Sequence, residues 1–398
     1  MIAWLIAPIY LLLHLYLLLR LLYWLGAFHR HLASRSARSV LTGLFFILAV
    51  SPLAGFLIPT GLFHRIFRVL ANCWMGVLLY ALLAVLAADS FCFMIRRLCS
   101  RFRRQPDRGR LCRRAGCLTL AAVCLVSFYG VGHARSIIVD RRQVEIQKSC
   151  TLPSLRVALI ADLHLGYNAG NGLMKQMVEK LNREKPDLVC LAGDIFDNEY
   201  DAIQNPDQVA HTLAGIQCRY GVYAVFGNHD LKERVLAGFT FKGSGADKKQ
   251  DDSRFLTFLK KAHIQLLQDD GVLIDNAFYL FGRKDKSRVK KTGEDRLSSG
   301  QLLEGTDSNK PILVMDHQPK ELSALAAAGA DMVLSGHTHD GQLFPGNLLV
   351  RLINENAGGI KKIEAMTSAV TSGVGVWGPA MRVGTDSEIL LLDISFTG

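Results

Sequence analysis

The sequence predicts an α/β domain preceded by a transmembrane region with about four helices, and two observations lead to this prediction. The first is a sharp change of composition near residue 145. Residues 1–145 carry 18 arginines, no lysine and four acidic residues, a net charge of +14, whereas the rest of the 398-residue chain has a net charge of −3. The second is that short apolar runs alternate with amphipathic segments from Thr151 onward, which is typical of α/β domains. We therefore treat residues 1–145 and 151–398 as separate domains.

The first domain contains four apolar stretches that are each long enough to cross a bilayer, which takes about 20 helical residues. They are residues 2–27, 40–63, 69–95 and 115–133. The first stretch is longer than a signal-peptide core and has no basic residue before it, which favours an uncleaved helix. We therefore expect a multi-pass protein of a bacterial inner (cell) membrane.

Arginines gather in two of the connections between these stretches. They are Arg30, Arg35 and Arg38 after the first stretch, and Arg96, Arg97, Arg101, Arg103, Arg104, Arg108, Arg110, Arg113 and Arg114 after the third. The positive-inside rule places both connections in the cytoplasm, so the second domain is predicted to be extracytoplasmic. If the stretch at 40–63, which contains Pro52 and Pro59, only re-enters the membrane, the second domain lies on the other side. Because the positive charge belongs to the membrane region, we expect no nucleic-acid partner, and no protein partner is evident.

Five near-continuous apolar runs predict strands that are covered on both faces. They are residues 157–161, 187–192, 221–226, 311–315 and 330–335. Apolar residues at helical spacing predict crossover helices around Leu173 to Leu181 and around Val209 to Ile216. Cys190 lies inside the second run, which predicts a small buried hydrophobic residue rather than a reactive thiol.

Each predicted strand is followed by side chains that can bind metals. They are Asp162 and His164, then Asp194, then Asn228 and His229, then His317, and finally His337 and His339. Sites in open α/β sheets form outside the carboxyl ends of strands, so these side chains are expected to converge on one crevice. Imidazole and carboxylate ligands suit Mn, Fe or Zn.

The segments around these residues resemble the motifs of the calcineurin-like metallophosphoesterase superfamily, in the same order along the chain. The motifs are Asp162-Leu163-His164, Gly193-Asp194-Ile195-Phe196-Asp197, Gly227-Asn228-His229-Asp230, Asp316-His317-Gln318-Pro319 and Gly336-His337-Thr338-His339. The resemblance covers residues 155–394, and the tail from Ser372 to Pro379 is similar to that of the bacterial membrane-linked branch. It implies a four-layer αββα metallophosphoesterase sandwich.

The resemblance also implies two divalent metal ions and a role for each residue. The first ion would be held by Asp162, His164, Asp194 and His339, and the second by Asp194, Asn228, His317 and His337. Two ions so close would acidify a shared water, giving a bridging hydroxide that attacks phosphorus. His229 is the candidate catalytic residue that protonates the leaving oxygen, with Asp230 holding its orientation.

Two further acidic residues lie beside these motifs. Asp340 stands where this branch usually carries glycine, and we interpret it as a partner of a metal ligand or a solvated turn residue. Asp197 is interpreted as loop support.

The short connection between the last apolar stretch and the second domain holds that domain close to the membrane. This favours a phosphate-containing substrate in the membrane, such as a lipid phosphate or diphosphate. Two alternatives remain open: a cytoplasm-facing pyrophosphatase of UDP-diacylglucosamine type, and a non-catalytic membrane sensor that uses the fold as a binding module. The basic run from Arg283 to Arg296 is either a solvated face or a contact with anionic head groups. Residues 242–252 are predicted to form a mobile loop.

Overall fold

The computed structural model describes residues 2–398 except 30, 103–106, 234, 237–238 and 241–251. Arg30, Arg103, Arg104 and all but the last residue of the predicted loop at 242–252 therefore lie outside the described residues. The chain divides into two compact units, Met1–Val131 and Gly132–Gly398. Each unit is described by itself below.

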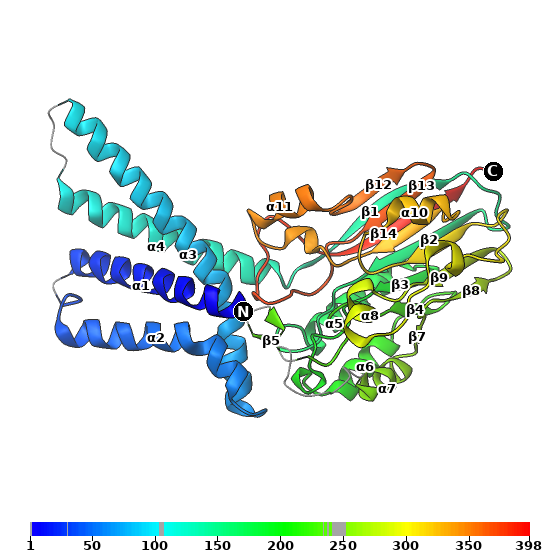
Figure 1. The fold of residues 1–398 in the computed structure, drawn as a ribbon, viewed down its shortest axis with the longest axis horizontal. Coiled ribbons are helices and arrows are strands. Elements are labelled where there is room, and N and C mark those ends of the chain that lie inside the picture. Colours follow the sequence, from blue (N-terminus) through cyan, green and yellow to red (C-terminus); the bar gives the residue numbers. More distant parts are fainter. Residues whose placement is uncertain (1, 30, 103–106, 234, 237–238, 241–251) are drawn as a thin grey trace. The chain divides into compact units, whose positions relative to one another are not determined.

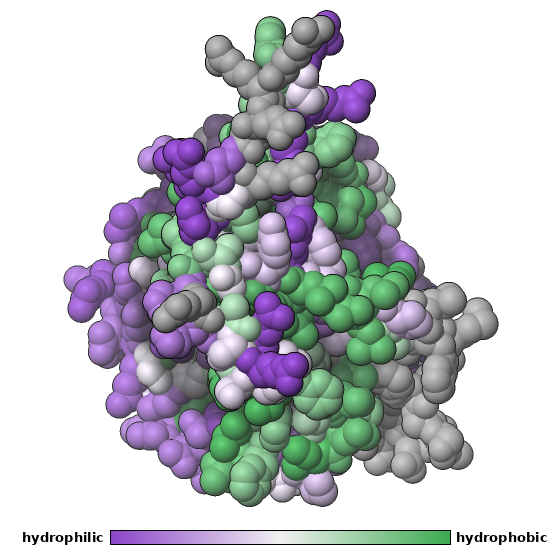
Figure 2. All heavy atoms as spheres, turned by 90° about the vertical axis from the view of Figure 1, so that its left-hand side faces the viewer, coloured by the Kyte–Doolittle hydropathy of each residue, from purple (hydrophilic) through white to green (hydrophobic). Residues whose placement is uncertain are grey.

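The first unit is built from long apolar helices. They are α1 (Ile2–Phe28), α2 (Arg35–Leu57), α3 (Leu62–Arg101) and α4 (Arg108–His133). All four are long and apolar enough to cross a membrane, as the sequence predicted. Helix α2 continues through Pro52. Large apolar side chains are exposed along the helices, and Figure 2 shows hydrophobic surface (green) on this side of the molecule.

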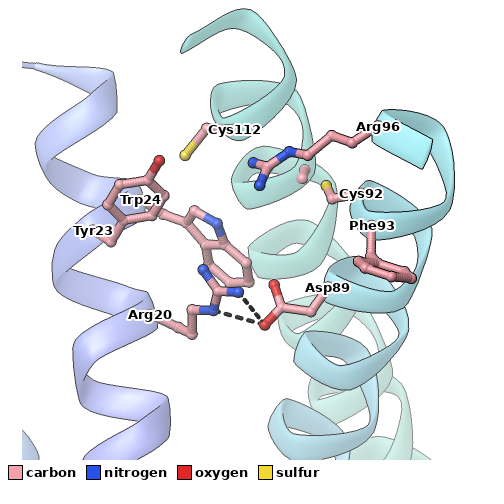
Figure 3. Close-up of a pocket in the computed structure, with 9 residues that line it drawn as sticks. Arg20, Tyr23, Trp24, Asp89, Cys92, Phe93, Arg96 and Cys112 are labelled. Carbon is pink, nitrogen blue, oxygen red and sulfur yellow. Dashed lines mark hydrogen bonds and ion pairs between the residues drawn. The ribbon is translucent and has the colours of Figure 1, made fainter. Parts of the chain in front are cut away.

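Polar side chains pair with one another inside the helical unit (Figure 3). Asp89, the only acidic residue within a predicted span, accepts hydrogen bonds from Arg20 Nε at 2.7 Å and from the Tyr16 hydroxyl at 2.6 Å. Arg20 and Asp89 line a cavity of about 270 Å³ between α1, α3 and α4, into which Arg96 and Cys112 also point. The ion pair joins α1 to α3, which lowers the cost of placing both charges in a membrane span.

The second unit contains two six-stranded sheets (Figure 1). In spatial order, the first sheet consists of β1 (Ile137–Ile146), β14 (Ser387–Phe396), β2 (Ser154–Ile160), β3 (Leu188–Ala192), β4 (Val222–Val225) and β7 (Ile264–Leu266). The second consists of β12 (Gly359–Ile363), β13 (Met366–Val370), β11 (Met332–Ser335), β10 (Ile312–Met315), β9 (Phe278–Gly282) and β8 (Asp270–Ile274). A small hairpin pairs β5 (Val235–Leu236) with β6 (Phe239–Thr240).

The sheets pack face to face, with helices on their outer faces. Val157, Leu159 and Cys190 of the first sheet share one buried cluster with residues of the second, including Leu313 and Leu334. A second cluster joins the first sheet to α5 (Asn171–Glu184), α6 (Pro206–Ala214) and α7 (Ser253–Lys261), and a third joins the second sheet to α9 (Ser299–Leu302) and α10 (Leu322–Ala327). The remaining elements are α8 (Lys286–Thr292), α11 (Gly346–Ile353), η1 (Tyr200–Ala202) and η2 (His339–Gly341). The predicted αββα sandwich, with four apolar helices before it, is confirmed, and Cys190 is buried as predicted.

The second unit begins earlier than the boundary placed at residues 145–151. Residues 137–146 form β1, which pairs in parallel with β14 from Ile137 opposite Ser387 to Ile146 opposite Phe396. Only three residues separate the end of α4 from the start of β1. The apolar pattern did not predict this strand because Asp140, Arg141 and Arg142 interrupt its apolar residues at the solvent-facing edge of the sheet.

Candidate metal centre

The predicted ligands follow the carboxyl ends of β2, β3, β4, β10 and β11, as the sequence indicated. The backbone turns sharply there, because φ is positive at Asp162, His164, Asp194, His337 and His339. Left-handed backbone at a residue other than glycine costs about 1–3 kcal/mol and gathers at functional sites. These turns bring side chains from both sheets into one crevice.

One cluster of ligand atoms is formed by Asp162, His164 and His339. Nε2 of His164 lies 3.1 Å from Nε2 of His339 and 3.9 Å from Oδ1 of Asp162. Nε2 of His339 lies 3.6 Å from the same Asp162 oxygen. Burial, and then the proximity of His164, lower the pKa of His339 well below its usual value. Two imidazoles that face each other beside a carboxylate, one of them held neutral, form a donor set that suits a cation.

A second cluster is formed by Asp194, His317 and His337, and Asn228 lies against it. Nε2 of His317 lies 3.1 Å from Oδ2 of Asp194 and 3.2 Å from Oδ1 of Asn228. The same Asp194 oxygen lies 3.9 Å from Nε2 of His164 in the first cluster. The carboxylate of Asp194 therefore lies between the two clusters, where one group can serve both.

The surroundings of these side chains also fit a bound metal. Nδ1 of His317 lies 2.7 Å from the carbonyl oxygen of Ala192, and donation to this carbonyl leaves Nε2 free as a ligand. Burial opposes a charge on His317, yet the Asp194 carboxylate raises the pKa of His317 well above its usual value. Burial likewise raises the pKa of Asp162 to about 6. A divalent cation supplies the positive charge that these buried carboxylates need, so the residues fit divalent metal ions.

His229 lies at the edge of the crevice, with its ring 5.1 Å from the ring of His164. Its Nδ1 is 2.6 Å from Oδ1 of Asn198, a contact that the sequence did not reveal. The predicted orientation of His229 by Asp230 is wrong. Asp230 is buried and accepts hydrogen bonds from the backbone nitrogens of Gly227 at 2.7 Å and Phe196 at 2.8 Å. Its carboxylate thus supports the loops that carry the site, and burial raises its pKa to about 7.

Asp197 and Asp340, the two other acidic residues beside the motifs, have different partners. Oδ1 of Asp197 lies 3.6 Å from Nδ1 of His164, a buried nitrogen that forms no hydrogen bond within the described part of the chain. Asp340 has φ of 44°, and its carboxylate accepts a hydrogen bond from Nη2 of Arg351 at 2.9 Å. Asp340 therefore holds a neighbouring helix, α11.

Sequence reasoning also missed Arg382, which is fully buried. Its Nη2 donates to the carbonyl oxygens of Ser372 at 2.6 Å and Gly375 at 2.7 Å, and lies 3.4 Å from Nδ1 of His339. This guanidinium therefore ties the glycine-rich tail to the loop of His339. Nothing in the local sequence around Arg382 distinguishes it from a surface arginine.

The basic run from Arg283 to Arg296 is largely folded into the domain, although Lys286 and Lys290 are exposed. Arg283 is buried and Arg296 is largely buried, and both pair with the carboxylate of Asp316, at 3.3 and 2.6 Å. Arg288 is also buried, while Lys286 pairs with Glu321 and Lys291 with Glu233. Much of the run therefore forms an ion-pair network, in which Asp316 beside His317 is the buried acidic partner.

Comparison with known proteins places these features in context. A family model described as calcineurin-like phosphoesterase matches residues 155–341. An uncharacterized metallophosphoesterase of Aquifex aeolicus is 29% identical over 65% of this chain and 92% of its own length. An uncharacterized metallophosphoesterase of Campylobacter jejuni is 26% identical over 64% of this chain, and a transmembrane protein with metallophosphoesterase domain of Danio rerio is 28% identical over 68%. The matches span only 62% and 61% of these two relatives.

Proposed function

Because this chain contains a calcineurin-like phosphoesterase domain, we propose that it is a membrane-anchored, metal-dependent hydrolase of phosphate esters or diphosphates in a lipid or cell-envelope substrate. One observation supports this most directly. Seven side chains of ligand type, from five strand ends in two sheets, lie together, with the carboxylate of Asp194 between the other six. A binding module without catalysis has no need of so complete a donor set.

We assign the seven residues to two metal positions that share Asp194. The first takes Asp162, His164 and His339, and the second takes Asn228, His317 and His337. Divalent ions held there would neutralise phosphoryl oxygens and lower the pKa of a water that serves as nucleophile. The protein orients these ligands with its own backbone, as the contact between His317 and Ala192 illustrates.

His229 is the proposed proton donor to the leaving oxygen. Asn198 fixes the ring through Nδ1, which leaves Nε2 as the atom that exchanges the proton. Burial lowers the pKa of His229, so an imidazolium protonated at Nε2 would be a stronger acid than a free one.

The membrane region supports a lipid or cell-envelope substrate. Four candidate spans precede the domain, and three residues join the last span to β1. So short a connection holds the domain within reach of the bilayer surface, where lipid phosphates lie.

Hydrolysis of a soluble chromogenic phosphodiester by the purified full-length protein with Mn²⁺ tests the proposal. We expect His229→Ala to retain the bound metal but lose about 10²–10⁴-fold in turnover, the usual contribution of a general acid. Asp194→Ala should lose both metal and turnover, whereas His211→Ala, an exposed histidine on α6, should change neither. Absence of turnover in metal-loaded parent protein across phosphomonoesters, phosphodiesters and lipid phosphates would overturn the proposal.

A further inference from the structure

Helix α11 presents an apolar face that no part of the described domain covers. Leu348, Leu349, Leu352 and Ile353 are between 54% and 83% exposed, and no residue of α11 is buried. Phe344, just before the helix, is also exposed. Large apolar residues grouped in this way on a soluble domain mark a binding surface. Figure 1 shows α11 beside β12, on the outside of the domain.

This helix is tied to the metal-binding loop. It begins seven residues after His339, and Asp340 holds it through Arg351. A Cβ atom on Gly341 would lie 2.3 Å from Cα of Asn347, so the backbones of η2 and α11 are in direct contact. A force on α11 is therefore transmitted to the turn that carries His339.

Two properties of the chain identify a lipid bilayer as the occupant of this face. Only three residues separate the last candidate span from β1, so the domain stays next to the membrane. Lys361 of the following strand is exposed and donates to the carbonyl oxygen of Glu355, two residues after the end of α11, rather than to a carboxylate. An apolar helix face with an exposed lysine just beyond its end suits acyl chains beside anionic head groups.

We propose that α11 is an interfacial anchor whose Leu348, Leu349, Leu352 and Ile353 enter the surface of the bilayer that holds the chain. Through Asp340 and Arg351, this contact sets the metal crevice at the depth of the head-group phosphates. The part that concerns the substrate rests on the proposed function, and the membrane contact stands independently of it.

Photo-crosslinking of the full-length protein tests the membrane contact. A benzophenone amino acid replaces Ile353 in protein reconstituted into vesicles of equal parts phosphatidylcholine and phosphatidylglycerol. We expect phospholipid adducts, as from the same probe at Phe46 in α2, and none from Leu273 on β8, an exposed leucine of the same domain. Adducts to α1–α4, adducts to a second copy of the chain, or no adduct at position 353 would each overturn the proposal.

A double variant separates the anchor from catalysis. With the probe at position 353, Leu349→Ser together with Leu352→Ser should reduce lipid adducts at least tenfold, while Leu256→Ser together with Leu273→Ser should not. Both variants should hydrolyse the soluble chromogenic ester within twofold of the parent, since the exposed leucines do not touch the ligands. Unchanged adducts in the first variant refute the anchor, whereas absence of ester hydrolysis in the parent refutes only the proposed function.

Discussion

At the scale of single residues, the position of Asp194 depends on a glycine from another strand end. A Cβ atom on Gly227 would lie 2.2 Å from Oδ1 of Asp194, closer than any allowed contact. We therefore expect Gly227→Ala to displace the shared carboxylate although every ligand is still present. A shift of about 1 Å can cost about 10²-fold in rate, so turnover should fall at least this far.

Metal content measured after dialysis and turnover of the chromogenic ester check this prediction. Gly172→Ala is the matched control, because a methyl group there meets open space at the start of α5. Equal metal content and equal rates in the two variants would show that Asp194 tolerates the displacement.

Asn198 is the residue whose role is least visible in the sequence. It holds Nδ1 of His229 at 2.6 Å, and its side-chain nitrogen donates to the carbonyl oxygen of Leu231 at 3.0 Å. Without this contact the His229 ring loses its fixed orientation, so Asn198→Ala should lower kcat by about 10–100-fold, the size of effect seen for residues that orient ligands. Metal content should not change. A fall in metal content equal to that of Asp194→Ala would instead assign Asn198 to the metal site.

At the scale of elements, β1 belongs to the fold of the second unit. Ile137 is buried against α5, whereas the neighbouring Ile138 points outward and is 39% exposed. We expect Ile137→Ala to destabilise the unit by about 2–5 kcal/mol, as for other buried Ile to Ala changes, and Ile138→Ala to cost far less. The temperature at which each variant becomes susceptible to proteolysis measures this difference in stability. Equal resistance in both variants would mean that β1 is dispensable.

The comparison of these elements with the sequence shows what pattern alone can reveal. The strands before Asp162, Asp194 and His317 were predictable because they are buried on both faces and read as unbroken apolar runs. Their ligands were predictable because strand ends converge in such sheets. β1 was not, since an edge strand exposed on one side mixes charged and apolar residues.

The ion pairs of the basic run show a second limit. Arg283 and Arg296 look solvated in sequence because Asp316 is distant along the chain. The contact between Asn198 and His229 could not be predicted either, because hydrogen bonds between loops leave no periodic pattern in the sequence. Sequence therefore predicted which candidate ligands would lie together, but not the side chains that hold them in place.

At the scale of the whole molecule, the buried carboxylates of the site couple metal binding to stability. Metal that binds only the folded unit, at about 100 times its Kd, should add about 2.7 kcal/mol. In a unit of this size, that corresponds to a rise in Tm of roughly 5–10 °C. Thermal unfolding with Mn²⁺ and with a chelator measures the shift, and Asp194→Ala should abolish it. An identical Tm with and without metal in the parent protein would contradict a metal site in the folded unit.

The membrane orientation follows from the distribution of arginine over the whole chain. The positive-inside rule predicts a cytoplasmic position for the helix ends that carry Arg35 and Arg38 at the start of α2, and Arg96, Arg97 and Arg101 at the end of α3. Because α2 is a continuous helix of 23 residues through Pro52, it is long enough to span, so we predict four spans and a second unit outside the cytoplasm. Alkaline phosphatase fused after Gly398 should therefore be active, and a fluorescent protein that folds only in the cytoplasm should stay dark. The same reporters inserted at residue 33, between α1 and α2, should give the opposite result. Cytoplasmic fluorescence from the Gly398 fusion would reverse the orientation and favour a substrate of the inner leaflet.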